Sequence, residues 1–501
     1  MTSETGLKAT WPTWTRLRLD VAPGAMERLR SEPRAWVPVT ARFGDGPGMA
    51  GRVRIKGTRG SVQALEQNPS FTVALERPSE ALGGATRFHL ENGAEDPWCV
   101  RGAWAAHVFQ EAGVPCPRQG WAGVRLNDRD LGCRGLKEGL DGAFVARAWP
   151  GEDVVLMEPR DGADVGDALE VKEAALRDGA KEGEARTRAM GAWRSLADAV
   201  QRGGWDAARP WMDEGAFVRF AAHEVLMGHR DGYALARNNY RVALVRGRLE
   251  WVPWGLDTLM ETPSLTMWPS MAGTLARALM ATEEGRASWM AALGSWNGAA
   301  LGADGFEAWA RECEAALRPG LGAGDFGAWR SALGELRRAL EARAAFVAKE
   351  LARGVPTHAL ASVGTAMRPV EWRAQGVPAD GAAREGKVEG RGVLELVAGE
   401  RNSSAWACPV QLGPGRYRFG GRARVEGFRG LPGARRDGAV VRVGNTSFRS
   451  RSLQAGAGWT ELRVDFRVEE PGTVVALMCE YRASAGRAVF DRASLLLERL
   501  E

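Results

Sequence analysis

The chain has 501 residues, of which 45% are hydrophobic and 26% are charged, a balance that is typical of globular domains and excludes wholesale disorder. Its 67 basic and 62 acidic residues leave a net charge of +5, which is too even a balance to predict a nucleic-acid-binding protein. The sequence contains no apolar run of about 18 residues, so no membrane-spanning helix is expected.

Cysteine and lysine usage narrows the chemistry further. The six cysteines are scattered and form no CxxC pair, which argues against a zinc site and excludes a dense disulfide framework. Only seven of the basic residues are lysines, so a reaction that needs an ammonium group has few candidates. The first residues lack the basic and apolar regions of a secretory signal, and the sequence as given predicts a cytoplasmic protein.

The first part of the chain is expected to be rich in strands. Residues 14–76 contain segments that alternate polar and apolar side chains, which is the pattern of half-buried strands. A helix is expected after Asp96 and Pro97, because an acidic residue caps a first turn and proline fits there. It would end near Glu111, and residues 122–140 would follow as a hairpin.

Helices dominate the middle of the chain. Residues 165–227 and 265–353 place apolar side chains at helical spacing. Two short strands are expected between them, at 240–245 and 249–253.

Composition changes again near the C-terminal end. Residues 356–390 are rich in Gly, Pro, Ala and charge without clear periodicity, which predicts a linker. Residues 391–501 consist of short strand patterns separated by glycine-rich turns, as in a β-sandwich. The expected fold class is therefore α+β, with a domain over 1–355 divided into a β-rich lobe (about 14–150) and a helical lobe (151–355).

The most informative motif lies between a predicted helix and a predicted strand. The tripeptide His-Arg-Asp at 229–231 is followed by Asn238, Asn239 and, after the two short strands, Asp257. Protein kinases use the same order, in which the first Asp accepts the substrate proton and Asn and the second Asp hold magnesium. The gap from Asp231 to either Asn is longer than in protein kinases, and a chance tripeptide is the alternative.

Further matches give the sequence a family resemblance over residues 14–350. The chain resembles the spore-coat CotH kinase-like family in the segments 53–61, 69–71, 96–101, 131–138, 217–240 and 252–257. The resemblance implies an atypical, protein-kinase-like two-lobed fold that transfers phosphate from ATP to Ser residues of partner proteins. It further implies that Asp231 is catalytic and that Asp257 and Asn239 (or Asn238) bind Mg²⁺.

One departure from the family pattern concerns the cations. Family members usually have lysines at two positions where this chain has Asn68 and Thr72. Lys56 is then the best-placed ammonium, on a strand that enters the turn 57–61, whose backbone N–H groups can hold phosphate. Arg59 in that turn is a substitute cation. Lys56 as a surface strand residue is the alternative, and the reduced cation set makes a pseudokinase a second hypothesis.

Two glutamates, Glu138 and Glu111, each have a functional and a structural interpretation. Glu138 falls where the two lobes would join, and either faces the adenine pocket or lies at a strand edge. Glu111 either pairs with Lys56, as the helix glutamate of kinases does, or lies at a solvated helix end.

The tail resembles jelly-roll carbohydrate-binding modules in the segments 415–421, 458–462 and 489–495. Polysaccharide binding through 391–501 would use aromatic side chains such as Trp406, Tyr417 or Trp459, each of which could equally be core. The leading hypothesis is an ATP- and Mg²⁺-dependent protein Ser kinase acting on surface or coat proteins, with a targeting module. The alternatives are a catalytically weak assembly or glycan-binding scaffold, and a glycan-modifying phosphotransferase.

Overall fold

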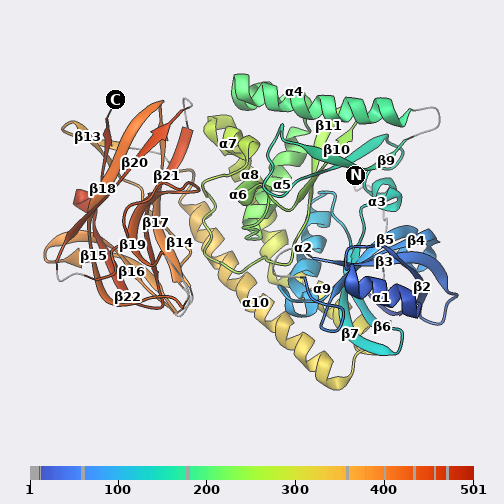
Figure 1. The fold of residues 1–501 in the computed structure, drawn as a ribbon. Helices are drawn as coiled ribbons and strands as arrows, with labels where there is room; N and C mark the ends of the chain where they lie inside the picture. Colours follow the sequence, from blue (N-terminus) through green and yellow to red (C-terminus); the bar gives the residue numbers. More distant parts are fainter. Residues whose placement is uncertain are drawn as a thin grey trace.

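The computed structural model contains three parts that follow one another along the chain: a barrel, a helical part and a C-terminal β domain (Figure 1). It describes residues 11, 13–57, 62–176, 181–356, 360–378, 380–399, 402–432, 436–455, 458–469 and 473–500. Helices and strands both occur, with the α-helices in the first two parts and strands in all three, in agreement with the α+β expectation.

The N-terminal part is a closed barrel of seven strands. The strands are Trp14–Asp20 (β1), Val37–Phe43 (β2), Met49–Lys56 (β3), Ser70–Ser79 (β4), Ala85–Glu91 (β5), Gln119–Leu126 (β6) and Arg129–Glu138 (β7). Their order around the barrel is β1-β2-β3-β4-β5-β7-β6, and the parallel pairing of β1 with β6 closes it. Every second residue of β2 is buried inside, so the alternation in the sequence correctly predicted strands here.

Two helices belong to this part of the chain, Pro23–Ser31 (α1) and Val100–Glu111 (α2). The Asp96 carboxylate accepts hydrogen bonds from the backbone N–H groups of Arg101 (3.2 Å) and Gly102 (2.8 Å). It therefore satisfies donors of the first turn of α2, as the sequence predicted.

The helical part also contains a four-stranded sheet. Its helices are Gly142–Ala148 (α3), Glu182–Ala208 (α4), Glu214–Leu226 (α5), Tyr233–Ala236 (α6), Thr274–Ala281 (α7), Glu283–Leu301 (α8), Ala303–Leu317 (α9) and Ala323–Ala352 (α10). The sheet has the order β11-β10-β8-β9, from Val154–Pro159 (β8), Leu169–Ala175 (β9), Tyr240–Val245 (β10) and Arg248–Pro253 (β11). Within the described residues, no helix combines the length and the apolar character needed to span a bilayer.

The expectation of helix from residue 165 was wrong at its start, where β9 lies. Its residues Leu-Glu-Val-Lys-Glu-Ala-Ala are mostly good helix formers, yet β9 pairs antiparallel with β8 as the edge strand of the sheet. Strand pairing with β8 overrides the local propensity. The two short strands expected between the helical stretches are confirmed as β10 and β11.

The C-terminal domain consists of an eight-stranded and a four-stranded sheet that share one hydrophobic core. Its strands are Leu360–Val363 (β12), Ala366–Pro369 (β13), Arg373–Gln375 (β14), Ala382–Val388 (β15), Arg391–Val397 (β16), Asn402–Leu412 (β17), Gly415–Arg429 (β18), Gly438–Val443 (β19), Thr460–Val468 (β20), Thr473–Ala483 (β21), Ala485–Asp491 (β22) and Leu496–Arg499 (β23).

The predicted linker at 356–390 was wrong, because β12 to β15 lie within it. These strands are short or, like β15, have no buried residue, so their sequences carry little hydrophobic periodicity.

The aromatic residues considered for sugar binding are mostly core. Trp406 and Tyr417 are buried in the C-terminal core, where the Trp406 indole donates to the Glu395 carbonyl. Trp459 is half-buried and its indole nitrogen lies 3.1 Å from a Glu389 carboxylate oxygen. Burial therefore excludes Trp406 and Tyr417 as an exposed platform for a sugar ring.

The C-terminal domain packs against the helical part on the outer face of its smaller sheet. A small apolar cluster on that sheet includes Ala476 and Met478, and β21 contacts α7. The Asn445 amide donates to the Ser270 carbonyl, and the Ser264 hydroxyl donates to the Val377 carbonyl (3.0 Å). These contacts hold the segment that runs from β11 to α7.

A buried arginine on α10 anchors the same region from the other side. The Arg343 guanidinium donates to the carbonyls of Val225 (2.6 Å) and Leu226 (3.0 Å) at the end of α5. It also donates to the carbonyls of Pro263 (2.9 Å) and Leu265. Burial lowers the pKa of Arg343 to about 9, partly offset by Glu350. Arg343 therefore joins the end of α5 to the segment before α7.

Replacing Arg343 with leucine is expected to lower the free energy of unfolding by about 3 kcal/mol, because four buried or part-buried hydrogen bonds to backbone carbonyls are lost. Urea denaturation followed by tryptophan fluorescence measures the change. Arg338→Leu, at an exposed position of the same helix, is the control and should change stability by less than about 0.5 kcal/mol. An equal loss in both variants would contradict the role of Arg343.

Candidate active site

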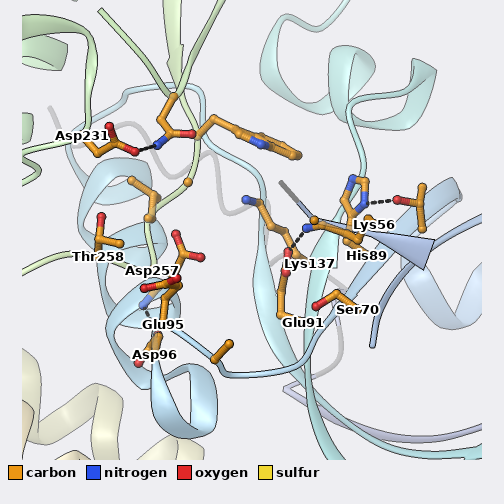
Figure 2. Close-up of a pocket in the computed structure, with 18 of the residues that line it drawn as sticks. Lys56, Ser70, His89, Glu91, Glu95, Asp96, Lys137, Asp231, Asp257 and Thr258 are labelled. Atoms are coloured by element: carbon orange, nitrogen blue, oxygen red, sulfur yellow. Dashed lines mark hydrogen bonds and ion pairs between the residues drawn. The ribbon is translucent and has the colours of Figure 1, made fainter. Parts of the chain in front are cut away.

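A cavity of about 470 Å³ lies between the outer face of the barrel and the helical part. Side chains of β3, β4, β5 and β7 line it from the barrel, and residues 158–161, 238–241 and 254–258 line it from the helical part together with Asp231. Figure 2 shows acidic side chains, among them Asp231, Asp257 and Asp96, on one side and the two lysines Lys56 and Lys137 on the barrel side.

The loop after α5 is held by the buried carboxylate of Glu224. This carboxylate accepts hydrogen bonds from the backbone N–H groups of Tyr233 and Ala234, both at 2.9 Å. A side chain at Gly232 would meet Glu224, since a Cβ there would lie 2.3 Å from its Oε1 atom. The carboxylate thus supports the N-terminal end of the four-residue helix α6, directly after Asp231.

His229 connects this loop to the segment after β11. Its Nε2 lies 3.1 Å from the Gly255 carbonyl oxygen, and because a carbonyl only accepts, Nε2 carries the proton. Gly255 has a φ of 57°, and a Cβ there would lie 2.4 Å from the Asn239 side chain. Only glycine fits this close approach, which brings the segments of Asp231 and Asp257 together.

The two asparagines of the motif orient Asp231. The Asp231 carboxylate accepts a hydrogen bond from the Asn239 amide at 2.6 Å and from the Asn238 amide at 3.1 Å. Both amide nitrogens therefore face Asp231, and the amide oxygens remain available to accept a hydrogen bond or to bind a cation.

Asp257 lies among other carboxylates on the same side of the cavity. Burial raises the pKa of the neighbouring Asp96 to about 7, with a smaller contribution from the charge of Asp257, although backbone N–H groups oppose the shift. Asp257, Glu95 and the asparagine amide oxygens are hard oxygen donors of the kind that Mg²⁺ prefers. Within the described chain, no group of three His, Cys, Asp or Glu side chains is arranged as a metal site, so magnesium would also need amide oxygens or ligand phosphates.

Two lysines face the carboxylates from the barrel. The Lys56 ammonium lies 2.5 Å from a Glu91 carboxylate oxygen, and the Lys137 ammonium lies 3.6 Å from the centre of the Trp254 ring. Burial alone would raise the pKa of Glu91, but Lys56 and Lys137 together lower it. Burial also lowers the pKa of Lys137 from 10.5 to about 8, partly opposed by Glu91. The cavity therefore contains cations suited to phosphate beside carboxylates suited to magnesium.

Most of the residues selected from the sequence line this one cavity: Lys56, Asp231, Asn238, Asn239 and Asp257. Arg59 lies outside the described residues, together with most of the 57–61 turn.

Glu138 and Glu111 do not line the cavity. The Glu138 carboxylate is fully buried between Arg118 (2.6 Å) and Arg147 (2.7 Å), and no part of it lines the cavity. Glu111 is exposed at the end of α2, while Lys56 pairs with Glu91.

The sequence offered Lys8, Lys56 and Lys137 as the ammonium groups of the first part of the chain; we selected Lys56 and did not predict that Lys137 and Glu91 also line this cavity. They lie on the neighbouring strands β5 and β7, in which His89 pairs with Lys137 and Glu91 with Gly135. The scarcity of lysine in the first part of the chain is the one signal that pointed to Lys137.

The shifted pKa of Lys137 predicts a distinct titration. With the seven lysines ¹³C-dimethylated, one NMR signal is expected to titrate near pH 8, because burial disfavours the charged ammonium. The charge is present below this pH and lost above it, so the cavity becomes less positive as the pH rises through 8. Lys137→Arg should remove that signal, and titration of every lysine near its ordinary pKa would contradict the burial effect.

Comparison with solved structures gives only weak likenesses. The complex of HipA, HipB and operator DNA from Shewanella oneidensis MR-1 is 11% identical, covers 68% of this chain and 75% of its own, and has a TM-score of 0.29. TmCBM61 in complex with β-1,4-galactotriose is 17% identical, covers 26% of this chain and 90% of its own, and has a TM-score of 0.20. The xylan-binding domain from Paenibacillus barcinonensis Xyn10C is 11% identical, with 26% and 86% covered and a TM-score of 0.18.

TM-scores this low do not establish a shared fold. No curated protein matches the chain. The family model described as CotH kinase protein, in contrast, matches residues 53–319, a stretch that contains Lys56, Lys137, Asp231 and Asp257 and spans more than half of the chain. The chain therefore belongs to the CotH kinase protein family.

Proposed function

We propose that this chain is an ATP- and Mg²⁺-dependent phosphotransferase that modifies a serine hydroxyl of a partner protein. The observation that carries the proposal is the convergence of Asp231, Asp257, two asparagine amides and two lysines on one cavity. Phosphoryl transfer needs this set, because its transition state is stabilised by positioning and by opposite charge.

Asp231 is the residue that receives the acceptor hydroxyl. Its carboxylate is oriented by the Asn238 and Asn239 amides, which donate to it and leave it free to accept a further proton donor. The acceptor hydroxyl would donate its hydrogen bond to this carboxylate as its oxygen attacks.

Asp257 and the amide oxygen of Asn239 or Asn238 would hold magnesium. The donor set fits this ion, since it consists of carboxylate and amide oxygens at a cavity that opens to water and to phosphate. When bound, magnesium supplies positive charge against the phosphate oxygens. Lys56 and Lys137 supply further charge from the barrel side, and Glu91 fixes the Lys56 ammonium in place.

The two-lobed arrangement of a kinase is part of the same proposal. The barrel would serve as the β-rich lobe and α3 to α10 as the helical lobe, with the cavity between them. The contacts of Asn445 and Ser264 support a bracing role for the C-terminal domain, because they hold the segment that follows Asp257. A role in targeting the chain to surface or coat proteins remains part of the proposal.

A pseudokinase scaffold is the second candidate, and one observation favours it. The Lys56 ammonium, which would act on the ATP phosphates, already has Glu91 as a partner within the chain. Such a protein would keep the fold without turnover.

Asp231→Asn is expected to lower phosphate transfer from labelled ATP by about 100-fold or more, because the acceptor loses its proton acceptor. ATP binding by this variant should stay within about twofold of wild type, since Asp231 is assigned to the acceptor. Asp257→Asn should instead weaken Mg²⁺-dependent ATP binding, measured by calorimetry.

Asp128→Asn, at an exposed turn of the barrel, is the matched control and should leave both quantities unchanged. Nucleotide binding without transfer by the wild type would favour the scaffold. Absence of both binding and transfer would overturn the proposed function.

A further inference from the structure

A second group of cations lies at the same cavity. Arg34 and Arg54 line the cavity, and Arg87 lies nearby on β5. Among the described residues, none of these three guanidinium groups forms a salt bridge, whereas Arg391, Arg418 and several other arginines of the C-terminal domain do.

Arg54 is at the centre of the group. Its Nε atom is buried and has no hydrogen-bond partner within the described chain. Burial lowers the pKa of Arg54, and the charges of Arg34 and then Arg87 lower it further. A guanidinium that is partly desolvated beside two like charges is unfavourable unless an anion joins it.

One acidic residue, Glu158, acts favourably on Arg54 but is shared with other cations. Glu158 faces Arg54 across the cavity, but its carboxylate is already paired with Lys172 at 2.7 Å and with Arg241. Glu158 therefore offsets the positive charge of Arg54 only in part, and its effect on the Arg54 pKa is smaller than that of burial, Arg34 or Arg87.

His89 experiences the same positive field. Its pKa lies well below 6.5, first because it is buried and then because Lys56, Lys137, Arg87 and Arg54 surround it. His89 stays neutral as a result, and its Nδ1 lies 3.0 Å from the Thr72 hydroxyl.

The geometry of the arginines is preformed. The Arg54 guanidinium lies 4.7 Å from the centre of the Trp36 ring, and Arg52 lies 5.7 Å from the same ring. Arg34 donates to the Gly57 carbonyl at the end of β3. Stacking and this hydrogen bond orient both cavity-lining guanidinium groups before any ligand arrives.

We propose that Arg34 and Arg54, supported by Arg87, form an anion-binding subsite for a phosphate or carboxylate group, separate from the lysine pair. The group belongs either to the acceptor, as a phosphorylated or acidic side chain, or to the nucleotide. Choosing between these two sources rests on the proposed function. The existence of the subsite does not depend on the proposed function. Arginine is suited to such groups because its planar fork binds two oxygens at once.

Calorimetry with inorganic phosphate as the probe tests the subsite directly. Arg54→Gln is expected to weaken phosphate binding by about tenfold or more, because one charged hydrogen-bond donor is lost. Arg77→Gln, which removes the same charge from an exposed position of β4, is the control and should bind as wild type.

Thermal stability separates this role from a structural one. In phosphate-free buffer of low ionic strength, Arg54→Gln should melt at a higher temperature than wild type, because a like-charge repulsion is relieved. Phosphate should raise the Tm of wild type and leave the variant nearly unchanged. A lower Tm for the variant without phosphate, or unchanged phosphate affinity, would overturn the proposal.

Saturation with Mg²⁺ and a non-hydrolysable ATP analogue distinguishes the two sources. If inorganic phosphate still binds to the saturated protein, the subsite belongs to the acceptor. If the analogue displaces phosphate, the subsite belongs to the nucleotide. In the second case Arg54→Gln should also weaken binding of the analogue. The subsite and the proposed function can fail separately. If the protein transfers no phosphate but binds it, and Arg54→Gln weakens that binding, the proposed function is wrong and the subsite is supported.

Discussion

The site depends on one buried carboxylate and the histidine beside it. Glu224 holds the backbone of the loop after α5, and His229, whose Nδ1 lies 3.5 Å from Glu224, reaches across to the Gly255 carbonyl. The Glu224 carboxylate and the His229 ring are buried, where an unpaired polar group would cost more than at the surface. Glu224 accepts hydrogen bonds from the backbone of Tyr233 and Ala234 and His229 donates to the Gly255 carbonyl, and these hydrogen bonds hold the segments that carry Asp231 and Asp257.

Other parts of the molecule hold the two segments that Glu224 and His229 connect. Arg343 on α10 joins the end of α5 to the segment after Asp257, and the C-terminal domain contacts the same segment at Ser264 and Ser270. The positioning of the acidic side of the cavity is therefore distributed over α10 and the C-terminal sheets. It is more than a local property of the loop.

Carboxylates and lysines face each other in the cavity, with Asp231, Asp257 and Asp96 on one side and Lys56 and Lys137 on the barrel side, where Glu91 pairs with Lys56 (Figure 2). The cations differ in their partners. Lys56 pairs with Glu91, whereas Arg54 lies near other positive charges and near Glu158, whose carboxylate already forms an ion pair elsewhere. This difference suggests different tasks within one cavity. The ion pair with Glu91 fixes the position of the Lys56 ammonium. Among the described residues, Arg54 has no carboxylate of its own, so binding of an anion would stabilise it more.

The sequence by itself predicted the strands within residues 14–76 and 122–140 but not β5, and it predicted α2 with its Asp96 cap, β10 and β11. It also selected Asp231, Asn238, Asn239 and Asp257, because alternation, capping and motif order are local signals. It could not place Glu91 against Lys56 or bury Glu138 between two arginines, and it mistook β12 to β15 for a linker. These features arise from strand pairing between distant segments, which decides the neighbours of each side chain. Only the tertiary structure brings such segments together, and so only it decided which charges share the cavity.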